Sequence, residues 1–253
     1  MRPLADTGPA REPAYLRPGA AEALLAAAAV ASVAIGFLSG SRFVLPLAAA
    51  ALAYPFFLAD VRARKGRRAL ARMLVWALAM SVVTVAGTLA GPDRAAASIL
   101  RGEEYRDEMF RWIETGDGAE GDPSRFLPEH ALHFAIFCVL SVASAGFLAL
   151  AFGAVLLDYM NFYVAELLQR LDPLFPGALV AWPLYAMVRV AGFVSVAVAL
   201  THLSLALRAR RAPDRGFFFR WFYAGLALVA GDALLKIVLA PIGRDVLSGA
   251  LPA

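Results

Sequence analysis

The chain has a single cysteine, Cys138, and three histidines in 253 residues. One cysteine excludes both a disulfide framework and a Cys-x-x-Cys metal or redox motif. The phosphate-binding loop and the HExxH zinc motif are also missing, so no cofactor is implied. Only Lys65 and Lys236 are lysine among 24 basic residues, and no basic stripe is interleaved with exposed aromatic residues. The sequence therefore excludes a nucleic-acid surface and leaves an enzymatic function without a supporting motif.

Apolar residues dominate what is present, at 60% of the chain and a mean hydropathy of +0.66. Long apolar runs cover residues 20–38, 43–59, 70–91, 131–157, 178–207 and 217–240. A helix that crosses a bilayer needs about 20 mostly apolar residues. We therefore predict an all-α, polytopic integral membrane bundle with about six transmembrane helices, placed in a bacterial cell (inner) membrane with the lipid bilayer as its first partner. Residues 1–19 are expected to be a disordered tail and residues 20–253 a single transmembrane domain, whose first run is a retained helix.

The loop charges predict an orientation. A cluster of five basic residues between 62 and 68, joined by Arg72, marks a cytoplasmic loop, because short cytoplasmic loops are rich in Lys and Arg. The next loop, 92–130, carries ten acids against five arginines and is expected outside. A second arginine cluster at 208–220 lands outside if there are six crossings, against the same rule. Three explanations stay open: the rule fails here, residues 131–170 cross twice although no turn is evident there, or the loop 92–130 is misplaced.

Two amphipathic segments flank these runs. In residues 158–171, apolar side chains recur at helical spacing, which predicts an interfacial helix ended by Asp172-Pro173 or the returning half of a re-entrant hairpin. Leu100–Glu114 is predicted to be a helix lying on the membrane surface or against a partner. The acids Asp117, Glu120 and Asp122 do not match the calcium-loop spacing, so we expect a solvated turn.

Three charges fall inside the last two runs, and intramembrane charges indicate a functional site by default. Arg189 lies 23 residues before the centre of the basic loop near Ala212, and Asp232 and Lys236 lie 20 and 24 residues after it. Antiparallel packing of the two helices would bring all three to one depth. The cluster has two interpretations: an ion, proton or anionic-substrate site, or a structural pair in which Asp232 neutralises one cation while Lys236 extends to the interface.

The three histidines are a second candidate site. His130 and His133 are three residues apart at the outer end of one run, and His202 is placed near the same surface by a six-crossing topology. Three imidazoles could bind zinc, and two on different helices could hold a haem. Ordinary interfacial histidines are the alternative interpretation.

Small residues predict a packing surface. Ser141, Ala145, Ala149 and Gly153 recur every four residues, a spacing that lets helix backbones approach closely within the chain or against a protein partner. Three functions stay open: a non-enzymatic permease-like or assembly subunit acting through helix packing and the charge cluster, a scaffold whose acidic outer loop recruits a partner, and a histidine-based metalloenzyme or haem protein.

Overall fold

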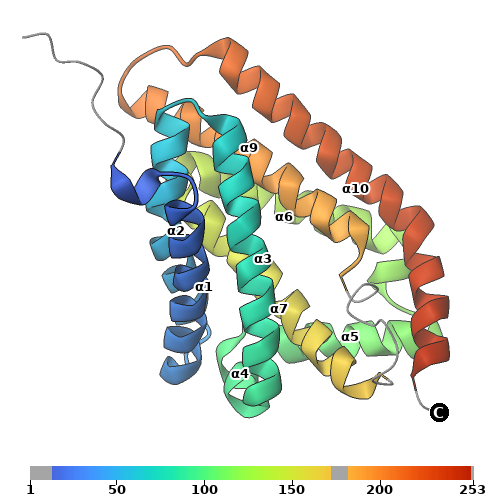
Figure 1. Ribbon diagram of the computed structural model, residues 1–253. Helices are drawn as coiled ribbons and strands as arrows, with labels where there is room; N and C mark the ends of the chain where they lie inside the picture. Colours follow the sequence, from blue (N-terminus) through green and yellow to red (C-terminus); the bar gives the residue numbers. More distant parts are fainter. Residues whose placement is uncertain (1–12, 172–181, 252–253) are drawn as a thin grey trace, which may run out of the picture.

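A computed structural model describes residues 13–171 and 182–251 (Figure 1). This part of the chain contains helices and no strands. Its helices are η1 (Ala14–Leu16), α1 (Ala20–Ser39), α2 (Val44–Arg62), α3 (Gly66–Ala90), α4 (Pro92–Ser98), α5 (Gly102–Thr115), η2 (Ala119–Gly121), α6 (Pro123–Ala143), α7 (Phe147–Arg170), α9 (Leu184–Arg208) and α10 (Arg215–Ala250). The predicted all-α polytopic bundle is confirmed.

Seven of the described helices are long and apolar enough to cross a membrane, rather than the predicted six: α1, α2, α3, α6, α7, α9 and α10. The extra crossing arises because the run 131–157 is broken at Ser144–Gly146. Ala145 (φ +52°) and Gly146 (φ +93°) both adopt left-handed backbone conformations, which reverse the chain within three residues. The Ser144 hydroxyl then accepts a hydrogen bond from the Leu148 amide at 2.8 Å, at the start of α7.

The seventh crossing brings the two arginine-rich loops to one end of the bundle, at the top of Figure 1. Arg64, after α2, forms an ion pair of 2.9 Å with Asp214, which precedes α10. We call this end the arginine face and the opposite end, which carries α4 and α5, the acidic face. The conflict between the two arginine clusters disappears with an odd number of crossings, and the positive-inside rule predicts that the arginine face is cytoplasmic.

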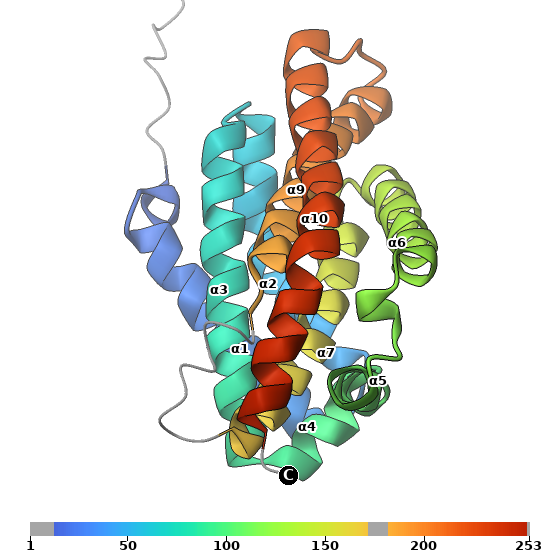
Figure 2. The same cartoon turned by 90° about the vertical axis from the view of Figure 1, so that its right-hand side faces the viewer.

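The α9–α10 hairpin is held together by a close backbone approach. A Cβ atom added to Gly192 would lie 2.9 Å from the side chain of Val229 and 3.1 Å from the carbonyl oxygen of Gly225. Only glycine fits there, so the two helices touch along their backbones, as small residues allow in membranes. This contact fixes the register that sets Arg189 opposite Asp232. Figure 2 shows α10 crossing in front of α9, with α3 to the left and α6 to the right of the pair.

The separate interfacial helix predicted at 158–171 is wrong, since α7 runs without a break from Phe147 to Arg170. Its polar residues Asp158 and Asn161 are buried in the bundle rather than solvated. The predicted Asp172-Pro173 terminator lies outside the described residues. The helix predicted at 100–114 is confirmed as α5.

The apolar face of α5 packs against other helices of the same chain. Met109 and Ile113 are buried in a cluster with residues of α7 and α10. Arg244 of α10 donates a hydrogen bond from Nε to the Trp112 carbonyl oxygen at 3.0 Å. The part of the acidic loop predicted to bind a partner is therefore already covered by the protein's own helices.

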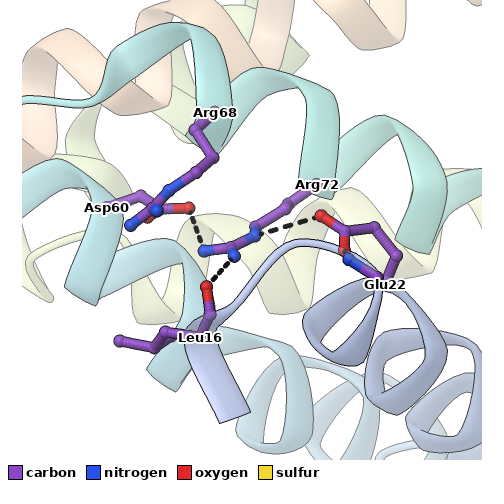
Figure 3. A network of polar contacts seen from close by, with 6 residues as sticks. Leu16, Glu22, Asp60, Arg68 and Arg72 are labelled. Atoms are coloured by element: carbon purple, nitrogen blue, oxygen red, sulfur yellow. Dashed lines mark hydrogen bonds and ion pairs between the residues drawn. The ribbon is translucent and has the colours of Figure 1, made fainter. Parts of the chain in front are cut away.

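A buried arginine ties the start of the chain to the bundle (Figure 3). Arg72 of α3, 1% exposed, donates to Asp60 at 2.7 Å, to Glu22 at 3.4 Å and to the Leu16 carbonyl oxygen. Asp60 also pairs with Arg68 at 2.5 Å. Residues 1–12 of the predicted disordered tail lie outside the described residues. Residues 14–16 form η1 instead, and Leu16 is buried.

The strip of small residues predicted as a packing face does not exist as a continuous surface. Ser141 is on α6, Ala145 is in the turn, and Ala149 and Gly153 are on α7. Because the helix reverses between them, the four-residue spacing does not place them on one face. The prediction failed because the spacing was carried across a turn that has neither proline nor charge to reveal it.

Candidate functional site

Arg189 and Asp232, which the sequence places at one depth, form an ion pair in the structure. The Arg189 guanidinium donates from Nε to Asp232 Oδ2 at 2.7 Å and from its terminal nitrogen to Oδ1 at 3.1 Å. Asp232 is 2% exposed, whereas Arg189 is 26% exposed. This bidentate geometry orients the guanidinium as well as neutralising it.

Lys236 has a different partner from the one predicted. Its ammonium donates to Glu120 Oε2 at 2.7 Å and lies 4.5 Å from the centre of the Phe126 ring. Lys236 is 2% exposed, so it does not extend to the interface. The hydroxyl of Tyr185 donates to the other Glu120 oxygen at 2.7 Å.

Glu120 is thus a site residue that sequence reasoning assigned to a solvated turn. Asp117 and Asp122 do lie at the surface, where both pair with Arg125. Burial on its own raises the pKa of Glu120, but the charges and hydrogen bonds of its neighbours, above all Lys236, outweigh burial and hold the pKa below its ordinary value. One sequence signal could have found it: two intramembrane cations with a single intramembrane acid leave one cation without a partner.

The three histidines are not brought together. His130 lies 4.0 Å from Asp232 Oδ2, and His133 lies 4.0 Å from Glu129 Oε1, both near the acidic face. His202 is at the arginine face, where its Nε2 accepts a hydrogen bond from the Asp214 amide at 3.1 Å. Because the chain crosses once more before α9 than predicted, α9 runs in the opposite direction to the predicted one. His202 therefore lies at the arginine face and not near His130 and His133. Within the described residues, no group of three or more His, Cys, Asp and Glu is placed to hold a metal ion.

A cavity of about 370 Å³ extends from this charged cluster into the bundle. Its polar end includes Arg189, Asp232, Lys236, Glu120 and His130. The rest of its wall is mostly apolar and aromatic, with residues from α3, α6, α7, α9 and α10 that include Trp76, Phe134, Phe137, Leu150, Phe193 and Val229. A volume of several hundred cubic ångströms with few convergent polar groups is typical of a small-molecule site.

The charges around the polar end are unequal. Two bases and four acids line the cavity: Arg189 and Lys236 against Glu108, Glu120, Glu129 and Asp232. The two bases are occupied by Asp232 and Glu120. Glu129 is paired with Arg101 at 3.8 Å, whereas Glu108 has no ion pair within the described part of the chain. The cavity mouth therefore keeps an excess of negative charge, carried by Glu108, and of hydrogen-bond acceptors.

An unpartnered donor lies at the apolar end. Trp76, 4% exposed, lines the cavity, and its indole N–H has no hydrogen-bond partner within the described residues. A buried donor without a partner is costly, and a ligand oxygen or a water in the cavity would satisfy it. At the other end, burial raises the pKa of Tyr105 well above its ordinary value, so this phenol stays a neutral donor at neutral pH.

Arg189→Ala and Asp232→Ala should each lower folded yield, and the double variant should recover part of the loss. Each single change leaves the other charge uncompensated, at a cost of about 3–5 kcal/mol where water is excluded and less where water reaches Arg189 through the cavity. Thermal unfolding of the four proteins in one detergent measures the coupling. Additive losses would show that the two side chains act independently.

The site has the geometry of a binding site for a small molecule, and its residues come from five transmembrane helices and the acidic loop. Fold alone does not name a function, which has to be argued from such a site. Comparison of the chain with protein-family models, with curated proteins and with solved structures finds no match.

Proposed function

We propose that this protein is a permease-like membrane protein that binds an amphiphilic molecule in the cavity between α6, α7, α9 and α10. The single observation that carries the proposal is the cavity itself, which joins a charged end to an apolar, aromatic wall. An amphiphile matches both ends at once: its tail replaces water along the apolar wall, and its polar group meets the charged end. The function is one of binding and positioning, without a chemical step.

The charge balance indicates the head group. Both lining bases are already paired, and Arg101 pairs with Glu129 at 3.8 Å, so Glu108 supplies the excess negative charge at the mouth. An anionic head group therefore meets net repulsion. A head group that donates hydrogen bonds, such as an amine, finds carboxylate acceptors. Tyr105 and Tyr159 line the same region, and aromatic faces also attract cations.

The apolar seam between α6 and α10 supplies an access route from the bilayer. α6 packs on α7, α9 and η2 but has few contacts with α10. Leu127 of α6 and Leu226 of α10 both line the cavity and are 42% and 41% exposed. A molecule dissolved in the membrane can therefore reach the cavity sideways, without crossing the charged loops.

Photolabelling tests the proposal. The probe is a long-chain amine with a diazirine in its tail, added to the protein in neutral lipid nanodiscs. We expect adducts on the cavity-lining stretches of α6 and α10, and we expect a matched long-chain carboxylate to label them weakly. Gly153→Leu should abolish the adducts, because Gly153 lines the cavity and a Cβ there meets only Phe137, at 3.8 Å.

Gly231→Leu is the matched control. A Cβ at Gly231 has nothing within 4 Å, and the residue does not line the cavity, so labelling should survive. Equal labelling of the wild type and Gly153→Leu would contradict the cavity as the site. Labelling by the carboxylate as strong as by the amine would contradict the assigned head group.

The other two functions stay predictions. A scaffold acting through the acidic loop has less free surface than predicted, because α5 packs on α7 and α10. The histidine-based metalloenzyme or haem protein loses His202 from its predicted ligand set. Metal and haem analysis of the purified protein tests that class directly.

A further inference from the structure

Asp158 is the buried carboxyl group that stands apart from the charged clusters. It lies near the middle of α7, packed against α3, and is 2% exposed. The other deeply buried carboxylates, Asp60, Glu120 and Asp232, each pair with arginine or lysine. Asp158 has no ion pair within the described residues.

The surroundings of Asp158 offer hydroxyl groups and no charge. Its Oδ1 accepts one long hydrogen bond, 3.4 Å, from the Thr84 hydroxyl, and its Oδ2 has no partner. The charged and titratable groups on the other helices that pack against α7 contact other residues than Asp158. Arg106 of α5 lies over Phe162, and His133 of α6 packs on Phe152. Tyr54 of α2 donates to the carbonyl oxygen of Ala145, two residues before α7.

An ionised carboxylate in such a place is very costly, and a group without a counter-charge neutralises instead. The neutral acid has one O–H donor and one acceptor oxygen. This matches the structure, in which Oδ1 accepts the hydrogen bond from Thr84 and Oδ2 is free to carry the proton. We propose that Asp158 is a proton-binding site within the membrane, protonated where α3 packs against α7.

A separate group of polar side chains lies beside this site, on the side of the acidic face. Asn161 follows Asp158 by three residues and so lies on the same side of α7. Its amide nitrogen donates to Ser81 of α3 at 3.2 Å, and its carbonyl oxygen accepts from the Trp182 indole at 3.0 Å. Trp182 is half-buried. Proton exchange with water is therefore expected from the acidic face, along the α3–α7 contact.

Infrared spectroscopy of the purified protein at neutral pH tests the proposal without any transport assay. We expect a carbonyl stretch typical of a protonated carboxylic acid, and we expect transfer to D₂O to shift it, because the proton exchanges. Asp158→Asn should remove the band, whereas Asp245→Asn, at an exposed acid of α10, should leave it. Thr84→Val should shift the band, since it removes the hydrogen bond to the carbonyl.

A second measurement guards against a variant that does not fold. A hydrophobic carbodiimide reacts with protonated carboxyl groups in apolar surroundings, and mass spectrometry of the wild type should locate its adduct on Asp158. Absence of the band together with absence of the adduct would overturn the proposal. A band that does not shift in D₂O would overturn the exchange route. Neither result depends on an amphiphile entering the cavity, so this inference and the proposed function can fail separately.

Discussion

Replacing Glu120 with alanine should destabilise the protein by about 3–5 kcal/mol, the cost of leaving one member of a buried ion pair without its partner. The Lys236 ammonium is 2% exposed and would lose its acceptor at 2.7 Å, so it would either stay charged without this partner or give up its proton, and both are costly. The loss should appear as a lower midpoint of thermal unfolding in detergent and a lower folded yield. Glu114→Ala, at an exposed acid of α5, should stay within about 0.5 kcal/mol of the wild type.

The double variant Glu120→Gln/Lys236→Met should recover most of that loss. It removes both charges and keeps similar volumes, and a buried pair exchanged for neutral side chains is often as stable as the original. If the double variant is no more stable than Glu120→Ala, the pair does not account for the effect of the single change.

Acid should act on the same pair. The pKa of Glu120 is lower in the folded protein than its ordinary value, so the stabilisation is fully present above the ordinary pKa, about 4.3. It is lost as the pH falls through the folded-state pKa, because the carboxyl group then takes up a proton. Unfolding midpoints measured against pH should show this loss in the wild type but not in Glu120→Gln/Lys236→Met.

Asp60→Ala should have an effect of similar size at the opposite end of the molecule. Asp60 is fully buried and pairs with both Arg68 and Arg72. Its removal leaves the Arg72 guanidinium in the bundle with its weaker contact to Glu22, 3.4 Å, and the Leu16 carbonyl. We expect a loss of about 3–5 kcal/mol in stability, measured by thermal unfolding.

The same variant should loosen the start of α1. Asp60 holds the same guanidinium that donates to Leu16 and Glu22 (Figure 3), so we expect those two contacts to weaken when Asp60 is removed. Hydrogen exchange of residues 14–25 should therefore rise more than that of α9. Asp93→Ala, at an exposed acid in α4, is the control that should change neither measurement. Unchanged exchange in Asp60→Ala would show that the start of α1 is held by apolar packing alone.

The fold class and the common depth of Arg189 and Asp232 could be predicted from the sequence, which left open whether Asp232 pairs with Arg189 or with Lys236. Both follow from one-dimensional quantities: the length of apolar runs, and equal distance from a loop between adjacent antiparallel helices. The α9–α10 contact at Gly192 then sets the register that makes the pair bidentate.

Glu120 and the Ser144–Gly146 turn could not be found in the same way. Glu120 reaches Lys236 because η2 folds back under the bundle, and no periodicity records the path of an irregular loop. The turn consists of small residues within an apolar stretch, where neither charge nor proline marks a boundary. Its one sequence signal was indirect: the arginine cluster at 208–220 contradicted an even number of crossings.

That turn also bears on how the protein is made. We expect α6 and α7 to enter the bilayer as a hairpin during synthesis, since a single merged span would place the α9–α10 loop on the opposite side of the membrane. The arginines around this loop oppose such a delivery, and the Arg64–Asp214 pair can form only after both loops have stayed on the same side. The arginines at 208–220 thus favour the topology that depends on the chain reversal at Ser144–Gly146, far earlier in the sequence.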